Sequence, residues 1–509
     1  MNYFLQNKRK IENFLVISAS LFIVLGLVYQ LVNLSNIVPF HDWDEAIYAQ
    51  VAKEFMRNPG FLLTYNGSAW FEKPFLPSFL YALSWWLIPV KKELVARSIS
   101  VFLSLLSLLT IFKIVRKLKI SKYLAVSALL FTTYSSMYID RSLLVNVDIM
   151  LTFGWLVYSL GYLDNNILYK VVGLIFGVLS KSLLGFFPLL TEIGVSVIYR
   201  KITFKKIFQW TLLITLSSLW HIYMIIVYKQ DFIKSHFLDH MVSRVTRPIE
   251  LHFGDKWFYI SKLFEVTNII LVLSVVGVVI FTIITIRKRL RNESLPKDIR
   301  GYLFLFALPI TYLALLTISK SKLHWYITPI IPFISIWTVV SIDQILRASS
   351  KNQSLIIRIG TIGLDIFVLV LFGLSVTHIQ ADWYTPTDKT IIGICIGKNK
   401  QNAKNITYVV LPQERKDANV IEAANLQIGS SFIYGSAPAF VYYSDLPVDF
   451  VYRESEIMKS ATNSDILVIS KEDLKNPVIN KSLIEAQNPP YSSTPFCKTS
   501  TLVALRKKA

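Results

Sequence analysis

The sequence has few charged residues, few acidic residues and almost no cysteine. Only 17% of its 509 residues are charged, whereas soluble domains average about 25%. The chain holds 33 aspartates and glutamates, 53 lysines and arginines, and two cysteines. This composition argues against a soluble enzyme. Two cysteines are also too few for a secreted scaffold held together by disulfides, and the chain is too apolar to be disordered.

Apolar residues and positive charge are abundant instead. Hydrophobic residues make up 53% of the chain, aromatic residues 14%, and the mean hydropathy is +0.49. A net charge of +20 is typical of nucleic-acid-binding proteins. In so apolar a chain, however, lysine and arginine more often mark the cytoplasmic loops of a membrane protein. We therefore expect a membrane protein that binds no nucleic acid.

Apolar runs of about 20 residues, the length that crosses a bilayer, recur along the chain. They predict a polytopic α-helical membrane protein with about 11–13 transmembrane helices. Basic clusters at Arg116, Arg200, Arg287 and Arg347 lie at alternate ends of the runs. By the positive-inside rule these clusters and the N-terminus are cytoplasmic, in a cytoplasmic (inner) membrane. The runs are 12–32, 94–114, 123–140, 146–163, 167–181, 183–199, 207–228, 263–286, 301–319, 323–345 and 355–377.

This topology leaves three segments on the outer side of the membrane. Two are loops of the transmembrane domain, which we assign to residues 1–379: they span about 33–93 and 229–262. Within the first loop, Pro74 to Val90 is too short for a span and predicts a helix lying in the membrane interface.

The third outer segment, residues 380–509, alternates short apolar runs with polar, helix-compatible stretches. This pattern predicts a C-terminal extracytoplasmic α/β domain. It contains both Cys395 and Cys497. A disulfide suits an oxidising compartment, and two buried thiols suit the pattern nearly as well.

The first outer loop carries two groups of ionisable residues. Asp44 and Glu45 follow the first span, and Glu72 and Lys73 lie in an aromatic setting nearly thirty residues later. Such carboxylates are most often solvated, and such an acid–base pair is most often a plain ion pair. The alternative is a glutamate that holds a cation beside a lysine that neutralises a phosphate.

Two further groups lie on the same predicted side. His240 and Arg244 are four residues apart, so a helix would place them on one face. Between two later spans come Lys322, His324 and Tyr326. Snorkelling explains a lysine at such a position, but it does not explain the neighbouring histidine and aromatic residues.

Four ionisable residues interrupt the apolar runs: Asp148, Lys181, Glu192 and Glu265. An ionisable residue inside a membrane is costly, which makes it a functional hypothesis by default. Asp148 lies at the outer end of its run, so we rank it above the other three as a functional residue. The other three are equally consistent with paired structural residues.

Carboxylates, a histidine, cations and aromatics at one membrane level suit the displacement of a phosphate leaving group from a lipid-borne sugar donor. A general base would deprotonate an acceptor hydroxyl while cations stabilise the departing phosphate. A lipid-phosphate transporter or flippase without glycosyl transfer is the alternative, because cations also bind headgroups.

The motifs also resemble a known family. Asp44-Glu45-Ala46-Ile47-Tyr48-Ala49, Phe71-Glu72-Lys73-Pro74 and Glu93-Leu94-Val95-Ala96-Arg97 resemble, in this order, the first periplasmic loop of ArnT-like membrane glycosyltransferases. That family is related to the protein O-mannosyltransferases and has the GT-C fold. Asp239-His240 with Arg244, and Ser321-Lys322-Leu323-His324-Trp325-Tyr326, are similar to its later motifs.

The resemblance implies an inverting glycosyltransferase, hexosyl or pentosyl, that uses a polyprenyl-phosphate sugar. The acceptor would be a lipid A-like glycolipid, a glycan or a protein. The resemblance implies catalytic roles for Asp44 and Asp148, and donor-phosphate binding by Lys73, Arg244 and Tyr326. It also implies a divalent metal ion, either zinc or magnesium or manganese, at Glu72 and His240, and no organic cofactor.

Three positions depart from the family pattern. Phe75 and His324 replace prolines, and Ser182 stands where the family often has glycine. Additional site residues are Glu45, Lys322 and His324, the last as an extra metal or phosphate ligand.

Overall fold

The computed structural model describes residues 2–291, 299–348, 351–377, 385–423, 434–435, 437–485 and 490–508. The chain forms two compact units. Unit 1 comprises Met1–Leu34, Leu94–Ile226 and Gly254–Ile379, and unit 2 comprises Ser35–Glu93, Val227–Phe253 and Gln380–Ala509. The predicted boundary between residues 379 and 380 lies outside the described residues.

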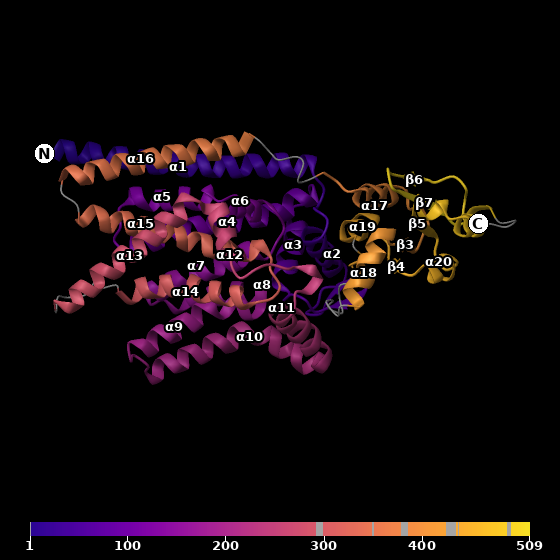
Figure 1. The fold of residues 1–509 in the computed structure, drawn as a ribbon, viewed down its shortest axis with the longest axis horizontal. Helices are drawn as coiled ribbons and strands as arrows, with labels where there is room; N and C mark the ends of the chain where they lie inside the picture. The colour runs from indigo at the N-terminus through magenta and orange to yellow at the C-terminus, as the bar shows by residue number, and fades with distance from the viewer. Residues whose placement is uncertain are drawn as a thin grey trace. The chain divides into compact units, whose positions relative to one another are not determined.

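Unit 1 is built almost wholly of helices (Figure 1). The first and last of them, α1 and α16, lie side by side, and the rings of Phe22 and Phe372 are 5.7 Å apart. Its helices are α1 (Asn2–Ile37), α4 (Lys92–Lys117), α5 (Lys122–Tyr134), α6 (Ser136–Leu143), α7 (Asp148–Asp164), α8 (Ile167–Lys181), η1 (Ser182–Phe186), α9 (Phe187–Ile198), α10 (Phe204–Phe232), α12 (Phe258–Thr267), α13 (Ile269–Leu290), α14 (Ile299–Ile318), η4 (His324–Ile330), α15 (Ile331–Ala348) and α16 (Lys351–Thr377).

By length and composition alone, seven helical stretches among the described residues could cross a membrane, or eight if the bent pair α6 and α7 is one span. This confirms a polytopic α-helical membrane protein. The predicted run 123–140 is interrupted at Ser135, whose ψ of 116° is extended. The seven are Val16–Ile37, Lys92–Lys117, Ile167–Ile198, Phe204–Thr246, Ile269–Arg287, Ile299–Ile318 and His324–Arg347.

Helices α7 and α8 pack with their backbones in contact because glycines line their interface. A Cβ atom on Gly154 of α7 would lie 2.6 Å from the Gly173 carbonyl oxygen and 2.6 Å from the Gly177 nitrogen of α8. Small residues four apart, here Gly173 and Gly177, are typical of close helix packing in membranes. Beyond α8 the chain reverses, since Gly185 packs against the backbone of Gly177. The packing of α7 on α8 places the start of α7 beside the end of α8.

Unit 2 contains the segments that the sequence predicts as outer loops. Helix α3, in the segment predicted to lie in the interface, has 12 residues and is about 18 Å long at 1.5 Å per residue, too short to cross a bilayer. Here Trp85 is buried and Trp86 is exposed. The elements of these segments are α2 (Asp44–Arg57), β1 (Leu63–Tyr65), β2 (Ser68–Trp70), α3 (Leu76–Leu87), η2 (Ile233–Val242), α11 (Ser243–Thr246) and η3 (Ile249–Leu251).

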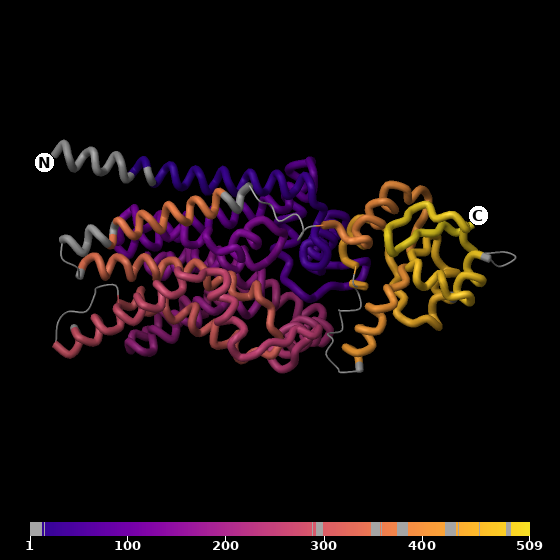
Figure 2. Tube along the Cα trace, turned by 45° about the horizontal axis from the view of Figure 1, so that its top comes forward, coloured from indigo at the N-terminus to yellow at the C-terminus, as the bar shows by residue number. Residues whose placement is uncertain are grey.

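The C-terminal part of unit 2 holds a five-stranded mixed sheet in the order β4-β3-β5-β7-β6 (orange to yellow in Figure 2). Strand β3 is parallel to β4 and β5, and β7 is antiparallel to β5 and β6. This confirms the predicted α/β character. The elements are α17 (Asp388–Asn399), β3 (Ile406–Val409), α18 (Pro412–Ala423), α19 (Pro438–Ser444), β4 (Val448–Val451), α20 (Glu454–Ala461), β5 (Ile466–Ser470), η7 (Asp473–Lys475), α21 (Pro477–Asn480), η8 (Lys481–Glu485), β6 (Cys497–Lys498) and β7 (Leu502–Arg506).

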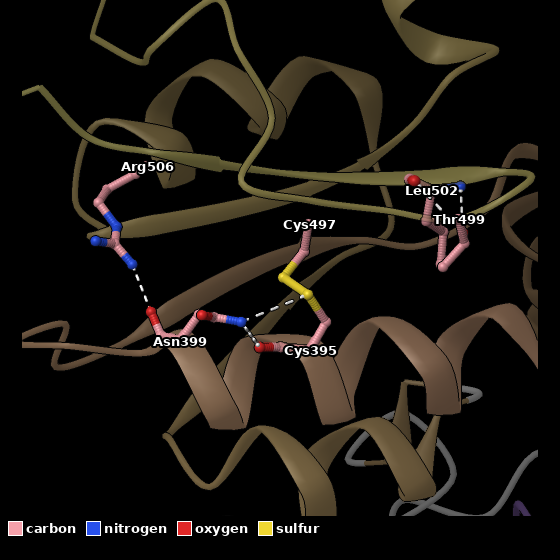
Figure 3. The surroundings of a disulfide bond; sticks show 6 residues. All are labelled: Cys395, Asn399, Cys497, Thr499, Leu502 and Arg506. Carbon is pink, nitrogen blue, oxygen red and sulfur yellow. Dashed lines mark hydrogen bonds between the residues drawn. A yellow bond between two sulfur atoms is a disulfide. The ribbon is translucent and has the colours of Figure 1, made fainter.

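A disulfide between Cys395 and Cys497 joins α17 to β6 (Figure 3). Beside it, the Asn399 amide donates a hydrogen bond to the Cys395 carbonyl at 2.9 Å, and Arg506 donates to the Asn399 carbonyl at 2.6 Å. Of the two alternatives for these cysteines, the structure contains the disulfide.

Replacing both cysteines by serine is expected to destabilise the sheet region by about 2–4 kcal/mol, because the bridge closes a long loop of the unfolded chain. The bonded residues are 102 apart in sequence. Limited proteolysis of the full chain in detergent, followed by mass spectrometry of fragments from residues 388–506, measures the effect. Reduction of the wild-type protein should give the same cleavage pattern as the double variant; an unchanged pattern in both would contradict the prediction.

Candidate functional site

A short loop after β2 is held by two histidines of η2 in unit 2. His236 Nδ1 lies 2.5 Å from the Phe71 carbonyl oxygen, and His240 Nε2 lies 3.3 Å from Glu72 Oε1. Both imidazoles are buried. The two histidines are four residues apart, so η2 presents both to the same loop. The structure thus brings Glu72 and His240 together.

Two cations lie beside this pair. Lys73 and Arg244 are both electrostatic neighbours of His240. Arg244 also contacts Glu250, with 3.4 Å between Arg244 Nη2 and Glu250 Oε2. Four residues from two predicted motifs, Glu72, Lys73, His240 and Arg244, therefore form one cluster in unit 2.

Asp44 is connected to the same cluster through His252. The His252 imidazole lies 3.8 Å from Glu250 and has Asp44 as a further electrostatic neighbour. Burial and the charge of Arg244 lower the pKa of His252, while Glu250 opposes the shift. At neutral pH a neutral imidazole is therefore favoured between the two carboxylates. Asp44 itself is half-buried in the first turn of α2.

Aromatic side chains form one wall of the cluster. The Trp70 indole donates a hydrogen bond to the Tyr434 hydroxyl at 2.7 Å, and that hydroxyl is hydrogen-bonded to Glu72. Burial and the nearby Glu72 carboxylate raise the pKa of Tyr434. The phenol therefore stays protonated and donates to Glu72. The rings of Tyr65 and Trp43 pack on Tyr434 at 5.0 and 6.0 Å.

Glu45 lies next to Asp44 in the chain and has a contact with the preceding turn. It is 2% exposed, and its Oε2 accepts a hydrogen bond from the His41 backbone nitrogen at 2.8 Å. A glutamate that bonds backward in this manner at a helix start fixes the turn that precedes the helix. Glu45 thus supports the loop that presents Asp44.

Glu72 and His240 provide an oxygen and a nitrogen that could face a metal ion. Among the described residues, no group of three or more His, Cys, Asp or Glu side chains is arranged to hold one. Zinc sites usually have three or four protein ligands. The residues present do not complete such a site, so we derive no chemical step through a metal.

In unit 1, Asp148 begins α7 and Lys181 ends α8. The two side chains form a buried ion pair, 2% and 7% exposed. The Lys181 ammonium also lies 4.2 Å from the centre of the Tyr326 ring. The glycine-lined packing of α7 on α8 brings the first two residues together, and η4 contributes the third. Similarly, Glu192 pairs with Lys170, which explains another of the ionisable residues in the apolar runs.

Lys322 and His324, the two additional site residues of the Ser321-to-Tyr326 motif, have local partners in unit 1. Lys322 Nζ donates to the carbonyls of Leu316 and Thr317 at 2.8 Å each, at the end of α14. Burial lowers the pKa of Lys322. A lysine in this position caps the helix and stabilises its dipole. His324 begins η4 with its ring 4.7 Å from that of Trp325 and with Arg141 as an electrostatic neighbour.

Ser182, which directly follows Lys181, has φ 50° and ψ −123°. This region favours glycine, because a Cβ atom is strained there. We expect Ser182→Gly to leave the stability unchanged or to raise it by up to about 1 kcal/mol, because glycine adopts this conformation without strain, although the change removes the 3.1 Å contact with His221. Ser182→Val should cost about 1–3 kcal/mol. Thermal unfolding in detergent measures both. As a control, Ser180→Gly in regular helix should lose about 0.5–1 kcal/mol; equal effects at the two positions would refute the explanation.

Three residues of the unit 2 cluster are absent from the sequence prediction: His236, Glu250 and His252. A signal for His236 exists, because His236, His240 and Arg244 recur at intervals of four. Glu250 has no such signal. It has φ 57° in the loop after α11, and only the turn of the chain brings it to Arg244.

The comparisons with known proteins rest on structure. No protein-family model matches the sequence, and a search of curated proteins finds no match either. ArnT from Cupriavidus metallidurans bound to undecaprenyl phosphate matches with a TM-score of 0.68 and 14% identity, over 95% of this chain and 97% of that one. The oligosaccharyltransferase of Archaeoglobus fulgidus in its apo form matches with a TM-score of 0.53 and 12% identity, over 92% and 71%.

A further structure of the Archaeoglobus enzyme, in complex with zinc and sulfate, matches with a TM-score of 0.51 and 12% identity, over 92% of this chain and 69% of that one. At such identities the likeness concerns the fold. The ArnT match extends over nearly the whole of both chains, so it includes the transmembrane helices and the C-terminal sheet together. The protein is a multi-pass membrane protein with the GT-C fold that ArnT has.

Proposed function

We propose that the protein is an inverting glycosyltransferase that moves a monosaccharide from a polyprenyl-phosphate donor to an acceptor at a membrane surface. The donor sugar is a hexose or a pentose, and the acceptor is a lipid A-like glycolipid, a glycan or a protein. The observation that carries the proposal is the cluster of Lys73 and Arg244 around His240, with Asp44 connected to it through His252. The chain has the fold of ArnT, whose structure contains bound undecaprenyl phosphate. This likeness supports a lipid-phosphate donor for the proposed reaction.

In the proposed reaction, the acceptor hydroxyl oxygen attacks the anomeric carbon of the donor sugar. The bond from this carbon to the phosphate oxygen breaks, and polyprenyl phosphate leaves with the bonding electrons. Asp44 accepts the hydroxyl proton as general base. Lys73 and Arg244 stabilise the charge that develops on the phosphate.

His240 and Glu72 have a positioning role in this proposal. Glu72 accepts a hydrogen bond from the Tyr434 hydroxyl and lies beside His240. These two contacts fix the position of its carboxylate. Lys73 follows it directly in the chain, so the buried pair fixes the backbone from which the lysine extends. In this proposal the Lys73 ammonium and the Arg244 guanidinium supply N–H donors for the phosphate.

Asp148 and Tyr326 of unit 1 keep their proposed roles as second acid and donor-phosphate ligand. The Asp148 carboxylate forms its buried ion pair with Lys181, next to the Tyr326 ring that the same lysine contacts. We further propose that the protein lies in the cytoplasmic membrane with a cytoplasmic N-terminus and an extracytoplasmic C-terminal domain, as the basic clusters of the sequence indicate.

Mass spectrometry of envelope glycolipids, glycans and proteins tests the function. Cells that lack the chain should lose a single hexose- or pentose-sized addition from one class of molecule. Wild-type protein should restore it, and so should Asp417→Asn, an exposed carboxylate of α18 that serves as a control. If all three classes are identical with and without the chain, the proposed transfer is wrong.

A further inference from the structure

Unit 2 contains a cavity of about 550 Å³ whose lining includes none of the residues of the proposed reaction. It lies at the C-terminal end of α2, beside α19 and the corner that joins α3 to α4. Its charged lining consists of four cations, Lys53, Arg57, Lys91 and Lys92, and two carboxylates, Glu93 and Asp445. The lining thus has an excess of positive charge, and Tyr442 and Tyr443 complete it.

Both carboxylates already have protein donors. Asp445 accepts from Arg57 at 2.5 Å and from Lys400 at 2.8 Å, and it lies 3.1 Å from the Lys53 ammonium. Although burial opposes it, these hydrogen bonds hold the pKa of Asp445 well below its usual range. The Tyr443 hydroxyl donates to Glu93 at 2.7 Å. The acidic groups are therefore occupied within the protein.

The cations have donor capacity beyond these contacts. An ammonium has three N–H groups and a guanidinium has five. Lys91 uses one contact, to the Asn36 carbonyl at 3.0 Å, and the Arg57 side chain remains 58% exposed. Burial lowers the pKa of Lys53 to about 8 against the effect of Asp445. A further anion in the cavity would favour its charged form.

The position along the chain indicates the level of this cavity in a membrane. Lys92 is the first residue of α4, one of the helices able to span a bilayer. The Lys92 ammonium lies 5.4 Å from the Trp85 ring, and the Trp85 indole donates to the Lys92 carbonyl. Tryptophan and lysine at the end of a span are typical of the headgroup region, where lipid phosphates lie.

We propose that this cavity binds a phosphate ester, supplied by the headgroup of an anionic membrane lipid. The exposed ammonium groups of Lys91 and Lys92 and the guanidinium of Arg57 are its ligands, while Lys53 and Asp445 hold the base of the cavity together. The bound phosphate fixes the end of α2 at the membrane surface. Nothing in the proposed glycosyl transfer requires this site.

Thermal unfolding of the delipidated full chain in detergent tests the proposal. The probes are a short-chain phosphatidic acid, inorganic phosphate, and a short-chain phosphatidylcholine as the zwitterionic reference. We expect phosphatidic acid to raise the midpoint saturably, and Lys91→Gln/Lys92→Gln to weaken this effect roughly tenfold or more in apparent Kd. The double variant Lys416→Gln/Lys498→Gln, with two exposed lysines of unit 2, removes the same charge and should bind as the wild type does.

The outcomes separate the two sources of phosphate and separate this site from the donor site. Binding of phosphatidic acid alone supports a lipid, and equal binding of inorganic phosphate supports a soluble phosphate in the same cavity. Lys73→Gln should leave the effect intact. The proposal is overturned if Lys91→Gln/Lys92→Gln keeps the wild-type affinity, if the control double variant loses it equally, if phosphatidylcholine stabilises as strongly, or if Lys73→Gln abolishes binding.

Discussion

Asp44→Asn is expected to lower the rate of glycosyl transfer by roughly 10² to 10⁴, the usual contribution of a general base. Asparagine keeps the size of the side chain and removes its ability to accept a proton. The loss of one negative charge from the first turn of α2 should cost only about 0.3–1 kcal/mol of stability. The protein should therefore remain folded and continue to bind polyprenyl phosphate. Release of polyprenyl phosphate from a labelled donor, with purified protein in lipid nanodiscs, measures the rate.

Asp417→Asn provides the control for charge removal and should transfer at the wild-type rate. The same experiment separates an enzyme from a flippase. If the protein is a flippase, the wild type will bind the donor but release no polyprenyl phosphate. An Asp44→Asn variant with full transfer activity would show that Asp44 is not the base. Reduced donor binding in this variant, with an unchanged rate at saturation, would assign Asp44 to binding alone.

Asp148→Asn is expected to destabilise the protein by about 3–5 kcal/mol, because it leaves the Lys181 ammonium without a compensating charge in a buried setting. Both side chains are almost completely buried. The effect should appear as a lower thermal midpoint in detergent and as less folded protein recovered from membranes. Fluorescence-detected size-exclusion chromatography after a heating series measures both.

A double-mutant cycle separates the structural contribution of Asp148 from its proposed catalytic one. Asp148→Asn/Lys181→Met removes both charges and should recover most of the lost stability. If Asp148 also acts in the reaction, the recovered protein will still transfer slowly. Recovery of both stability and activity would make Asp148 a purely structural residue, and no recovery of stability would contradict the ion-pair explanation.

Much of the helical architecture is predictable because local hydrophobic pattern determines it. The apolar run 94–114 lies within α4, and the separate runs 167–181 and 183–199 correspond to α8 and α9. The interruption of 123–140 at Ser135 is not visible in hydropathy. There Thr132 and Thr133 bond to the carbonyls of Ala128 and Leu129, an arrangement that bends helices.

The site is only partly predictable, since local spacing does not encode contacts between distant segments. The interval from His240 to Arg244 predicts a shared face, and both residues lie in the unit 2 cluster. The partner of Asp148, by contrast, depends on the close packing of α7 on α8, which brings Lys181 beside it. For Lys322 the sequence suggests a site residue, but its ammonium donates to two carbonyls at the end of α14. The position of a lysine in a loop does not predict such a helix cap.

The composition of unit 2 from three distant segments has a consequence for biosynthesis. The hydrogen bond from the Phe40 nitrogen to the Tyr443 hydroxyl joins residues 403 apart. At a synthesis rate of about 5–20 residues per second, the first segment waits roughly 20–80 s for its partner. The intervening helices enter the membrane during this interval. Completion of unit 2 is therefore a late event, and we expect nascent chains that stop before α19 to be substrates for chaperones and proteases.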